Sequence, residues 1–180
     1  MAGRKIEVVD YNPRWLEDFQ RESRTLNNIL KNITTTMHHI GSTSVPGLAA
    51  KPIIDILIEI ESLSLIDSLN DQLKAIGYIA KGEFGIVGRR YFQKGGNNKT
   101  HQIHIFSIGD FNITRHIAFR DYLIAFPKVA REYETLKRSV AEMCGNDIDR
   151  YCLGKHKFLQ HYEAKAIEWF TLNNQTQPTD

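Results

Sequence analysis

A run of isoleucines interrupted by two acids constrains the fold most. Residues 52–60 read PIIDILIEI, and they are apolar except for Asp55 and Glu59. A continuous apolar run of this length is typical of a strand that is buried on both faces of a sheet. Because side chains alternate along a strand, Asp55, Leu57 and Glu59 are expected on one face. An aspartate is rarely buried without a partner, so Asp55 is expected to meet a cation, a metal ion or an open site.

The two acids of this strand are not expected to act together. At the usual strand rise Asp55 and Glu59 lie about 13 Å apart, which is too far for them to share one metal ion. Glu59 is therefore interpreted as a surface residue at the end of the strand, and Asp55 as the candidate functional acid.

A Gly-Ser turn lies ahead of the acidic strand. Its residues offer hydroxyl and backbone N–H groups, and they are Gly41, Ser42, Thr43 and Ser44. Such a turn at the start of a helix can bind phosphate through its N–H groups. A tight turn at Gly41 with Ser44 as a helix N-cap accounts for the same residues, and the sequence leaves both interpretations open.

The remaining pattern predicts an α+β fold in one domain. Strands are expected at 6–10, 36–40, 52–60 and 78–80, followed by a hairpin whose turn contains Gly95, Gly96, Asn97 and Asn98. Helices are expected from Asn12 to about residue 30, at 64–76, from residue 112 onward, at 127–143 and at 149–170. The domain is predicted to span 1–172, with 173–180 as a frayed polar tail.

Composition excludes several classes of protein. Hydrophobic residues make up 42% and charged residues 24% of the 180 residues, and no apolar run approaches the roughly 20 residues that span a bilayer. The first residues lack the apolar segment of a signal peptide, and two cysteines suggest neither a disulfide framework nor a zinc site. A net charge of +2 gives no strong signal for nucleic acid. We expect a cytoplasmic protein without a membrane partner, and the oligomeric state stays open.

The motifs together resemble a known family. A Gly-Ser turn followed by a short helix and an acidic strand resembles the polymerase-β-like nucleotidyltransferase fold, and HIGSTSVPGLAAKPIID is similar to the signature of the GrpB family. The segments GRRYFQKG, THQIHIF, RHIAFRDYL and YCLGKHKF resemble GrpB segments in the same order, over roughly residues 5–170. The family is often described as predicted nucleotidyltransferases, and in some bacteria it is fused to dephospho-CoA kinase.

The resemblance implies a fold and an activity. The fold is a small mixed sheet flanked by helices, with a helical C-terminal part. The activity is transfer of a nucleotidyl group from a nucleoside triphosphate to an unidentified acceptor. Enzymes of this superfamily typically hold Mg²⁺ with two acids two residues apart on this strand and a third on a neighbouring strand.

This sequence departs from that pattern at two of the three acids. Leu57 stands two residues after Asp55, and the hairpin strand reads His101-Gln102-Ile103-His104 without a carboxylate. Imidazoles can replace carboxylates as metal ligands or act as general bases. We therefore expect Asp55 and His104 as the catalytic pair. The candidate ligands of a divalent ion, Mg²⁺ or Mn²⁺, are Asp55, His104, Gln102 and His39.

Basic residues complete the predicted site. Arg90 and Lys94 alternate on one side of the first hairpin strand. Lys51 precedes the acidic strand and Lys155 lies near the start of the last helix. Together with the Gly41 to Ser44 turn, these residues are the candidate contacts for phosphate, the alternative being solvated surface charge. Ser42, Asp55, Arg90 and His104 are predicted to line one cleft.

Three functions remain open from the sequence. The first is nucleotidyl transfer, with Asp55 as metal ligand and Ser42 on the phosphates. The second is a non-catalytic module that binds a nucleotide or another phosphate-bearing metabolite, with a coenzyme A precursor as one option. The third is a metal-dependent hydrolase that uses a pair of histidines. Leu57 is the feature that separates the first function from the second.

Overall fold

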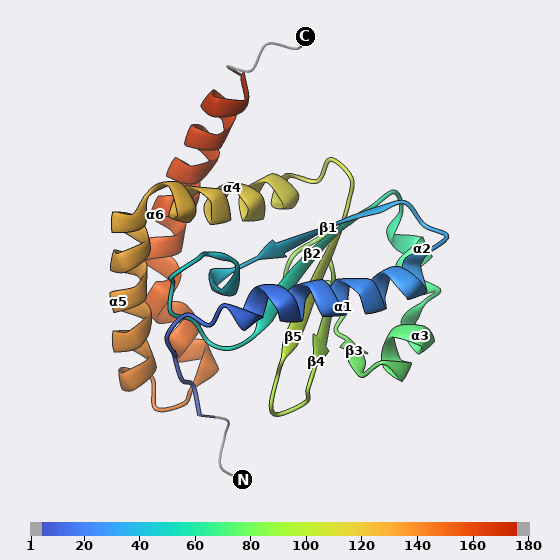
Figure 1. Cartoon of the computed structure of the whole chain (residues 1–180), viewed down its shortest axis with the longest axis horizontal. Helices are drawn as coiled ribbons and strands as arrows, with labels where there is room; N and C mark the ends of the chain where they lie inside the picture. Colours follow the sequence, from blue (N-terminus) through green and yellow to red (C-terminus); the bar gives the residue numbers. More distant parts are fainter. Residues whose placement is uncertain (1–4, 176–180) are drawn as a thin grey trace.

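A five-stranded mixed sheet forms the centre of the molecule (Figure 1). The computed structural model describes residues 5–175. The strands are β1 Thr35–Ile40, β2 Ile54–Ile60, β3 Tyr78–Ala80, β4 Arg90–Lys94 and β5 His101–Ser107. Their order in the sheet is β1-β2-β5-β4-β3, with β2 and β5 parallel and all other neighbours antiparallel.

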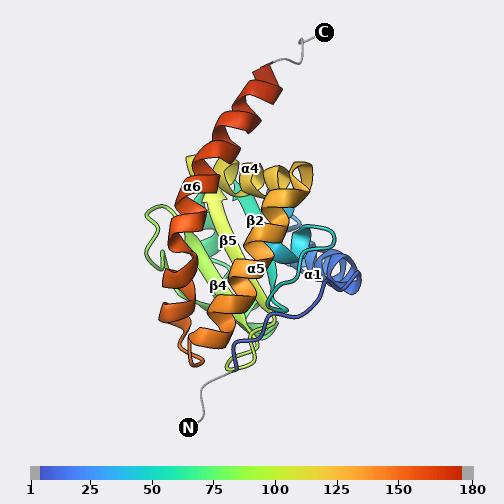
Figure 2. The ribbon, with the colours of Figure 1, turned by 90° about the vertical axis from the view of Figure 1, so that its left-hand side faces the viewer.

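Helices cover both faces of this sheet. They are α1 Arg14–Leu30, α2 Leu63–Asp67, α3 Asn70–Ala75, α4 Phe111–Ala125, α5 Pro127–Met143 and α6 Ile148–Gln175, with the 3-10 turn η1 at Ser42–Ser44. Helices α1, α2 and α3 pack on one face and α4 packs on the other. Helices α5 and α6 pack with α4, and Figure 2 shows α1 and α6 on opposite sides of the sheet. The structure confirms the predicted α+β fold with a mixed sheet and a helical C-terminal part.

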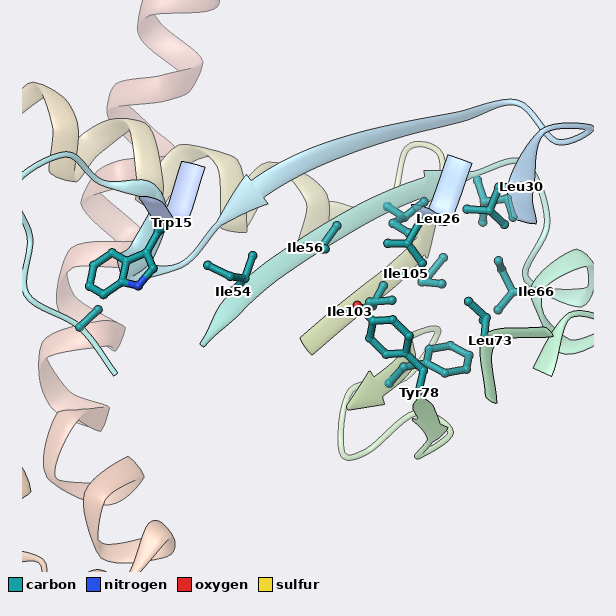
Figure 3. Close-up of a cluster of buried hydrophobic side chains, with 14 residues drawn as sticks. Trp15, Leu26, Leu30, Ile54, Ile56, Ile66, Leu73, Tyr78, Ile103 and Ile105 are labelled. Carbon is teal, nitrogen blue, oxygen red and sulfur yellow. The ribbon is translucent and has the colours of Figure 1, made fainter. Parts of the chain in front are cut away.

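The isoleucines of β2 build the core on the α1 face. Ile54, Ile56, Ile58 and Ile60 are at most 4% exposed, and they pack with residues of β5 and the first three helices (Figure 3). The intervening residues Asp55, Leu57 and Glu59 must then point to the face that carries α4, α5 and α6, as strand alternation predicts. Strand β2 therefore has an apolar face, which packs on α1, and a second face on which Asp55 lies.

Two of the predicted elements are wrong. The segment predicted as a strand at 6–10 makes only an isolated antiparallel bridge, between Val9 and Ala50, within the described part of the chain. The helix predicted at 64–76 is divided into α2 and α3. The Ser68 hydroxyl donates to the Leu65 carbonyl oxygen at 2.7 Å, and such side-chain bonds compete with the regular helical pattern.

The last helix is longer than the sequence predicts. Helix α6 continues to Gln175, so it includes the first residues of the segment expected to be a frayed tail. Residues 176–180 of that predicted tail lie outside the described residues. None of the helices in the described part of the chain is long and apolar enough to cross a membrane.

Candidate functional site

Asp55 and Gly41 meet at the centre of the candidate site. Gly41 has φ 72°, a left-handed conformation that favours glycine. A Cβ atom on Gly41 would lie only 2.6 Å from Asp55 Oδ2. The backbone of the turn can therefore approach the carboxylate closely only because position 41 has no side chain. This contact brings the turn after β1 onto the Asp55 face of β2.

Two hydroxyls of the turn stabilise the turn itself. Ser44 Oγ donates to the Gly41 carbonyl oxygen at 2.5 Å, and Thr43 Oγ1 donates to the Ile53 carbonyl oxygen at 3.3 Å. Because the Thr43 proton is used in this way, its oxygen accepts from His39 Nε2 at 3.0 Å. The hydroxyls of Thr43 and Ser44 are thus engaged within the fold, and their predicted contact with phosphate stays a prediction.

Ser42 lies near the C-terminal helices. Its hydroxyl interacts with the phenol of Tyr133, on α5. Burial raises the pKa of Tyr133, whose exposed fraction is 5%, so the phenol stays protonated. Ser42 therefore links the turn to α5, beside the Asp55 face of the sheet.

Three predicted residues share one face of the sheet. Gln102 lies opposite Asp55 in the parallel β2–β5 register, and His104 lies two residues further along β5. His104 Nε2 is 3.5 Å from Asp55 Oδ1, with side chains 12% and 24% exposed. His104 Nδ1 lies 3.3 Å from Arg89 Nη1. The structure thus brings Asp55, Gln102 and His104 together, while their roles stay predictions.

Arg89 is a site residue that the sequence analysis missed. Its side chain is 6% exposed, and burial lowers its pKa. Nε donates to the Glu83 carbonyl oxygen at 3.1 Å, and Nη2 donates to the Phe84 carbonyl oxygen at 2.5 Å. The guanidinium lies 4.7 Å from the centroid of the Tyr91 ring, which is itself 5.1 Å from the ring of His104. Arg89 is therefore held rigidly beside His104.

Arg90 and Lys94 lie on the other face of the sheet. They are in register with residues of β5 that face α1. Arg90 donates to Asp67 at 2.7 and 2.9 Å, and Lys94 donates to Glu22 at 2.8 Å. The prediction that Arg90 and Lys94 belong to the Asp55 site is therefore wrong, because strand alternation directs them to the opposite side.

His39 is also separated from Asp55. Its ring stacks on Phe19 of α1, with 4.8 Å between centroids and 6° between planes. Burial lowers the pKa of His39 to about 4, an effect that the Asp55 carboxylate opposes. Because the ring lies against α1 and Nε2 is bonded to Thr43, the prediction that His39 shares a metal ion with Asp55 is wrong.

Lysines from three segments converge on the C-terminal side of the site. Lys51 Nζ lies 4.7 Å and Lys155 Nζ 4.2 Å from the centroid of the same Tyr151 ring. Burial and the neighbouring Lys51 together lower the pKa of Lys155 to about 8, and Cys152 and Asp55 oppose the shift. Lys137, which is 2% exposed, donates to a backbone carbonyl, and burial lowers its pKa to about 7.

The residues present do not fit a resident divalent ion. Leu57 is fully buried and packs with Phe106 and with Ile113 of α4, so α4 covers the position of the second acid. Among the described residues, no group of three or more His, Cys, Asp or Glu side chains could hold a metal ion. Asp55 is the one carboxylate among the candidate ligands Asp55, Gln102 and His104, and Mg²⁺ bound by so few carboxylates is usually held by substrate phosphates as well.

A separate hollow lies behind the turn. It has a volume of about 620 Å³ between the segment Pro46 to Leu48 and helices α4 and α5. Arg131 and Arg138 are among its lining residues, whereas Asp55 is not. The hollow is therefore distinct from the Asp55 face.

The fold and the turn motif agree with a family match. The family model described as GrpB protein matches residues 5–165. The chain belongs to the GrpB family. YqkA of Bacillus subtilis (strain 168) is 46% identical over 166 residues, covering 92% of this chain and 48% of YqkA. The glutamate-rich protein GrpB of Alkalihalophilus pseudofirmus is 35% identical over 160 residues, covering 86% of this chain and 92% of that protein. The chain thus spans about half the length of YqkA and most of the Alkalihalophilus GrpB protein.

Solved structures support the GrpB fold. The crystal structure of GrpB from Enterococcus faecalis has a TM-score of 0.88 and 42% identity, covering 91% of this chain and 99% of that chain. A mutant of the Cid1 poly(U) polymerase bound to MgATP has a TM-score of 0.51 and 13% identity, covering 72% and 45%. At that identity the likeness shows the fold alone. The predictions of GrpB membership and of a nucleotidyltransferase-like fold are confirmed.

Proposed function

We propose that this GrpB chain binds a nucleoside triphosphate or another phosphate-bearing metabolite on the Asp55 face. The observation that carries the proposal is the pair of lysines, Lys51 and Lys155, that share the ring of Tyr151. Ser42 and the backbone of the turn lie on the sheet side of this site, and Lys155 lies on the helix side. A phosphate group bound between the turn and Lys155 would contact both the sheet and the C-terminal helices.

Charge explains why the site suits an anion. Burial makes it costly to keep Lys155 charged, and the neighbouring Lys51 adds to that cost. Phosphate oxygens would offset both effects by accepting charge-assisted hydrogen bonds. The Asp55 carboxylate faces the same region, and any divalent ion would enter with the triphosphate, as part of the substrate, rather than as a resident of the protein. The ligand is a metabolite of the cytoplasm, where we propose that the protein acts.

Nucleotidyl transfer is the second candidate function. It is favoured by the close contact between Gly41 and Asp55, because the carboxylate then lies beside the turn that is predicted to bind phosphate, on a fold similar to that of Cid1. The hydrolase alternative with His39 and His104 as its pair is not favoured, because these two residues lie on opposite faces of the sheet.

Titration calorimetry tests the binding proposal. Nucleoside triphosphates, dephospho-CoA and coenzyme A are titrated into the wild type with and without Mg²⁺. We expect at least one of these compounds to bind, and we expect Lys155→Ala to weaken its binding at least tenfold. The matched control is Glu59→Gln, on the same strand face but bonded to His38 at 2.7 Å, which should leave affinity unchanged. Absence of binding by every compound would contradict the proposal.

Transfer is tested separately from binding. The protein is incubated with ATP labelled on the α-phosphate, Mg²⁺ and a cell extract as the source of acceptor. Label in a new product that Asp55→Asn abolishes would establish nucleotidyl transfer. Binding of nucleotide without any labelled product would instead identify a binding module.

A further inference from the structure

We infer that Arg89 is a positioning residue that fixes the ring proton of His104 on Nε2, and that it thereby prevents His104 from binding a metal ion. The inference concerns the same face as the proposed function. Its test uses no nucleotide, so either idea can fail without the other.

The inference rests on the direction of the hydrogen bond between Arg89 and His104. Arg89 Nη1 lies 3.3 Å from His104 Nδ1. A guanidinium has five N–H donors and no acceptor, so Nδ1 must be the acceptor in this contact. The single proton of the ring then lies on Nε2, where it faces Asp55 Oδ1 at 3.5 Å. Arg89 therefore donates to one nitrogen of the His104 ring, and the Asp55 carboxylate lies 3.5 Å from the other.

The surrounding loop makes this arrangement rigid. Two carbonyl oxygens, of Glu83 and Phe84, accept from the same guanidinium, and the Tyr91 ring lies against its face. The Glu83 carboxylate accepts from the Gly88 N–H at 2.8 Å, which closes the loop. Phe84 has φ 45°, a strained conformation for a residue with a side chain. Such strain persists where neighbouring contacts over-determine the backbone.

Metal ligation by His104 would require the opposite arrangement of its proton. A metal ion bound between Asp55 and His104 needs the lone pair of Nε2, which moves the ring proton to Nδ1. That N–H would then face an N–H of Arg89, two donors 3.3 Å apart with no acceptor between them. Because the Arg89 contacts hold the guanidinium in place, the site disfavours this state. The missing third acid of the nucleotidyltransferase pattern and the Arg89 contact thus both disfavour a metal ion at this site.

Nitrogen chemical shifts of the histidine rings test the tautomer directly. Long-range proton–nitrogen spectra of the wild type at pH 8 should show His104 with a protonated Nε2 and an accepting Nδ1, with its signals assigned by loss in His104→Gln. In Arg89→Met the preference for Nε2 should weaken. A wild-type His104 with its proton on Nδ1 would overturn the inference, and this measurement does not depend on any variant folding.

Titration with Co²⁺ tests the consequence for metal binding. We expect Arg89→Met to bind Co²⁺ at least tenfold more tightly than the wild type, with the gain lost in Arg89→Met/His104→Gln. Arg89→Lys, which keeps a positive charge and a donor, should stay closer to the wild type than Arg89→Met does. Wild-type binding through His104 that is as tight as in Arg89→Met would contradict the inference.

Discussion

Gly41 gives the most direct test of the site geometry. Gly41→Ala places a Cβ atom 2.6 Å from Asp55 Oδ2 in a backbone with φ 72°. We expect a loss of about 1–3 kcal/mol in the free energy of unfolding from the strained backbone and a further loss from the clash. Urea denaturation measures both.

The strain and the clash at Gly41 can be separated. Gly47 has φ 78°, and nothing lies within 4 Å of a Cβ atom built there. Gly47→Ala therefore reports the strain alone, and the excess loss in Gly41→Ala reports the contact with Asp55. Equal losses in the two variants would show that the turn does not press on the carboxylate.

Lys137 should make stability depend on pH. Burial lowers its folded pKa to about 7 from 10.5, so between these values the unfolded chain binds more protons than the folded one. Stability of the wild type should therefore rise with pH across this window. We expect the wild type to gain about 2 kcal/mol relative to Lys137→Met between pH 7 and pH 9, measured by urea denaturation at both.

An exposed lysine on the same helix controls for other titrating groups. Lys128 lies on α5 and is exposed. Lys128→Met should show the same pH dependence as the wild type. Parallel pH profiles for the wild type and Lys137→Met would contradict the assignment of a buried, weakly basic lysine.

At the scale of elements, α4 determines which side chains fit on the Asp55 face of β2. Leu57 is fully buried beneath α4, so Leu57→Asp would place a carboxylate in an apolar cluster. We expect the free energy of unfolding to fall by about 3 kcal/mol or more without a gain in Mn²⁺ affinity. Leu57→Met, which keeps volume and polarity, should cost less than about 1.5 kcal/mol. A stable Leu57→Asp protein with tight Mn²⁺ binding would show that α4 is not a fixed cover.

The sequence predicts the elements of the sheet better than their register. The alternation around Asp55 predicts its strand and its face, because one face of β2 is lined by isoleucines. The hairpin turn between β4 and β5 leaves six residues unpaired, and a loop of that length does not determine the register of its strands. A shift of one residue exchanges Arg89 for Arg90 at the site, which is why the sequence pattern predicts the wrong arginine.

Long-range packing accounts for the rest of the site. Tyr133, Lys137 and Tyr151 look like ordinary helical residues in the sequence. They reach the segment between β1 and β2 only because α5 and α6 pack beside it. Lys137 and Ala49, which are in contact there, are 88 residues apart in the sequence. Local patterns carry no information on such a contact, so these residues were not predicted.

At the scale of the whole molecule, a ligand at the proposed site would join the sheet to the C-terminal helices. Saturation at 100 times the Kd adds about 2.7 kcal/mol to the free energy of unfolding. For a chain of this size the Tm should rise by roughly 5–10 °C. Hydrogen exchange should slow both in the turn before β2 and near Lys155 on α6.

A variant distinguishes bridging from one-sided binding. In Lys155→Ala the ligand should still slow exchange in the turn, at higher concentration, while exchange in α6 stays as in the free protein. Slower exchange in the turn alone in the wild type would show that the helices take no part in binding.

The burial of Leu57 also limits how this chain can evolve. An acid at position 57 is useful only if α4 first moves away, and displacing α4 without a new acid exposes apolar surface and gains nothing. The two changes are each unfavourable alone, so a single substitution at position 57 cannot supply the missing second acid of the nucleotidyltransferase pattern. Directed evolution toward metal-dependent transfer should therefore begin with libraries in α4 and its flanking loops.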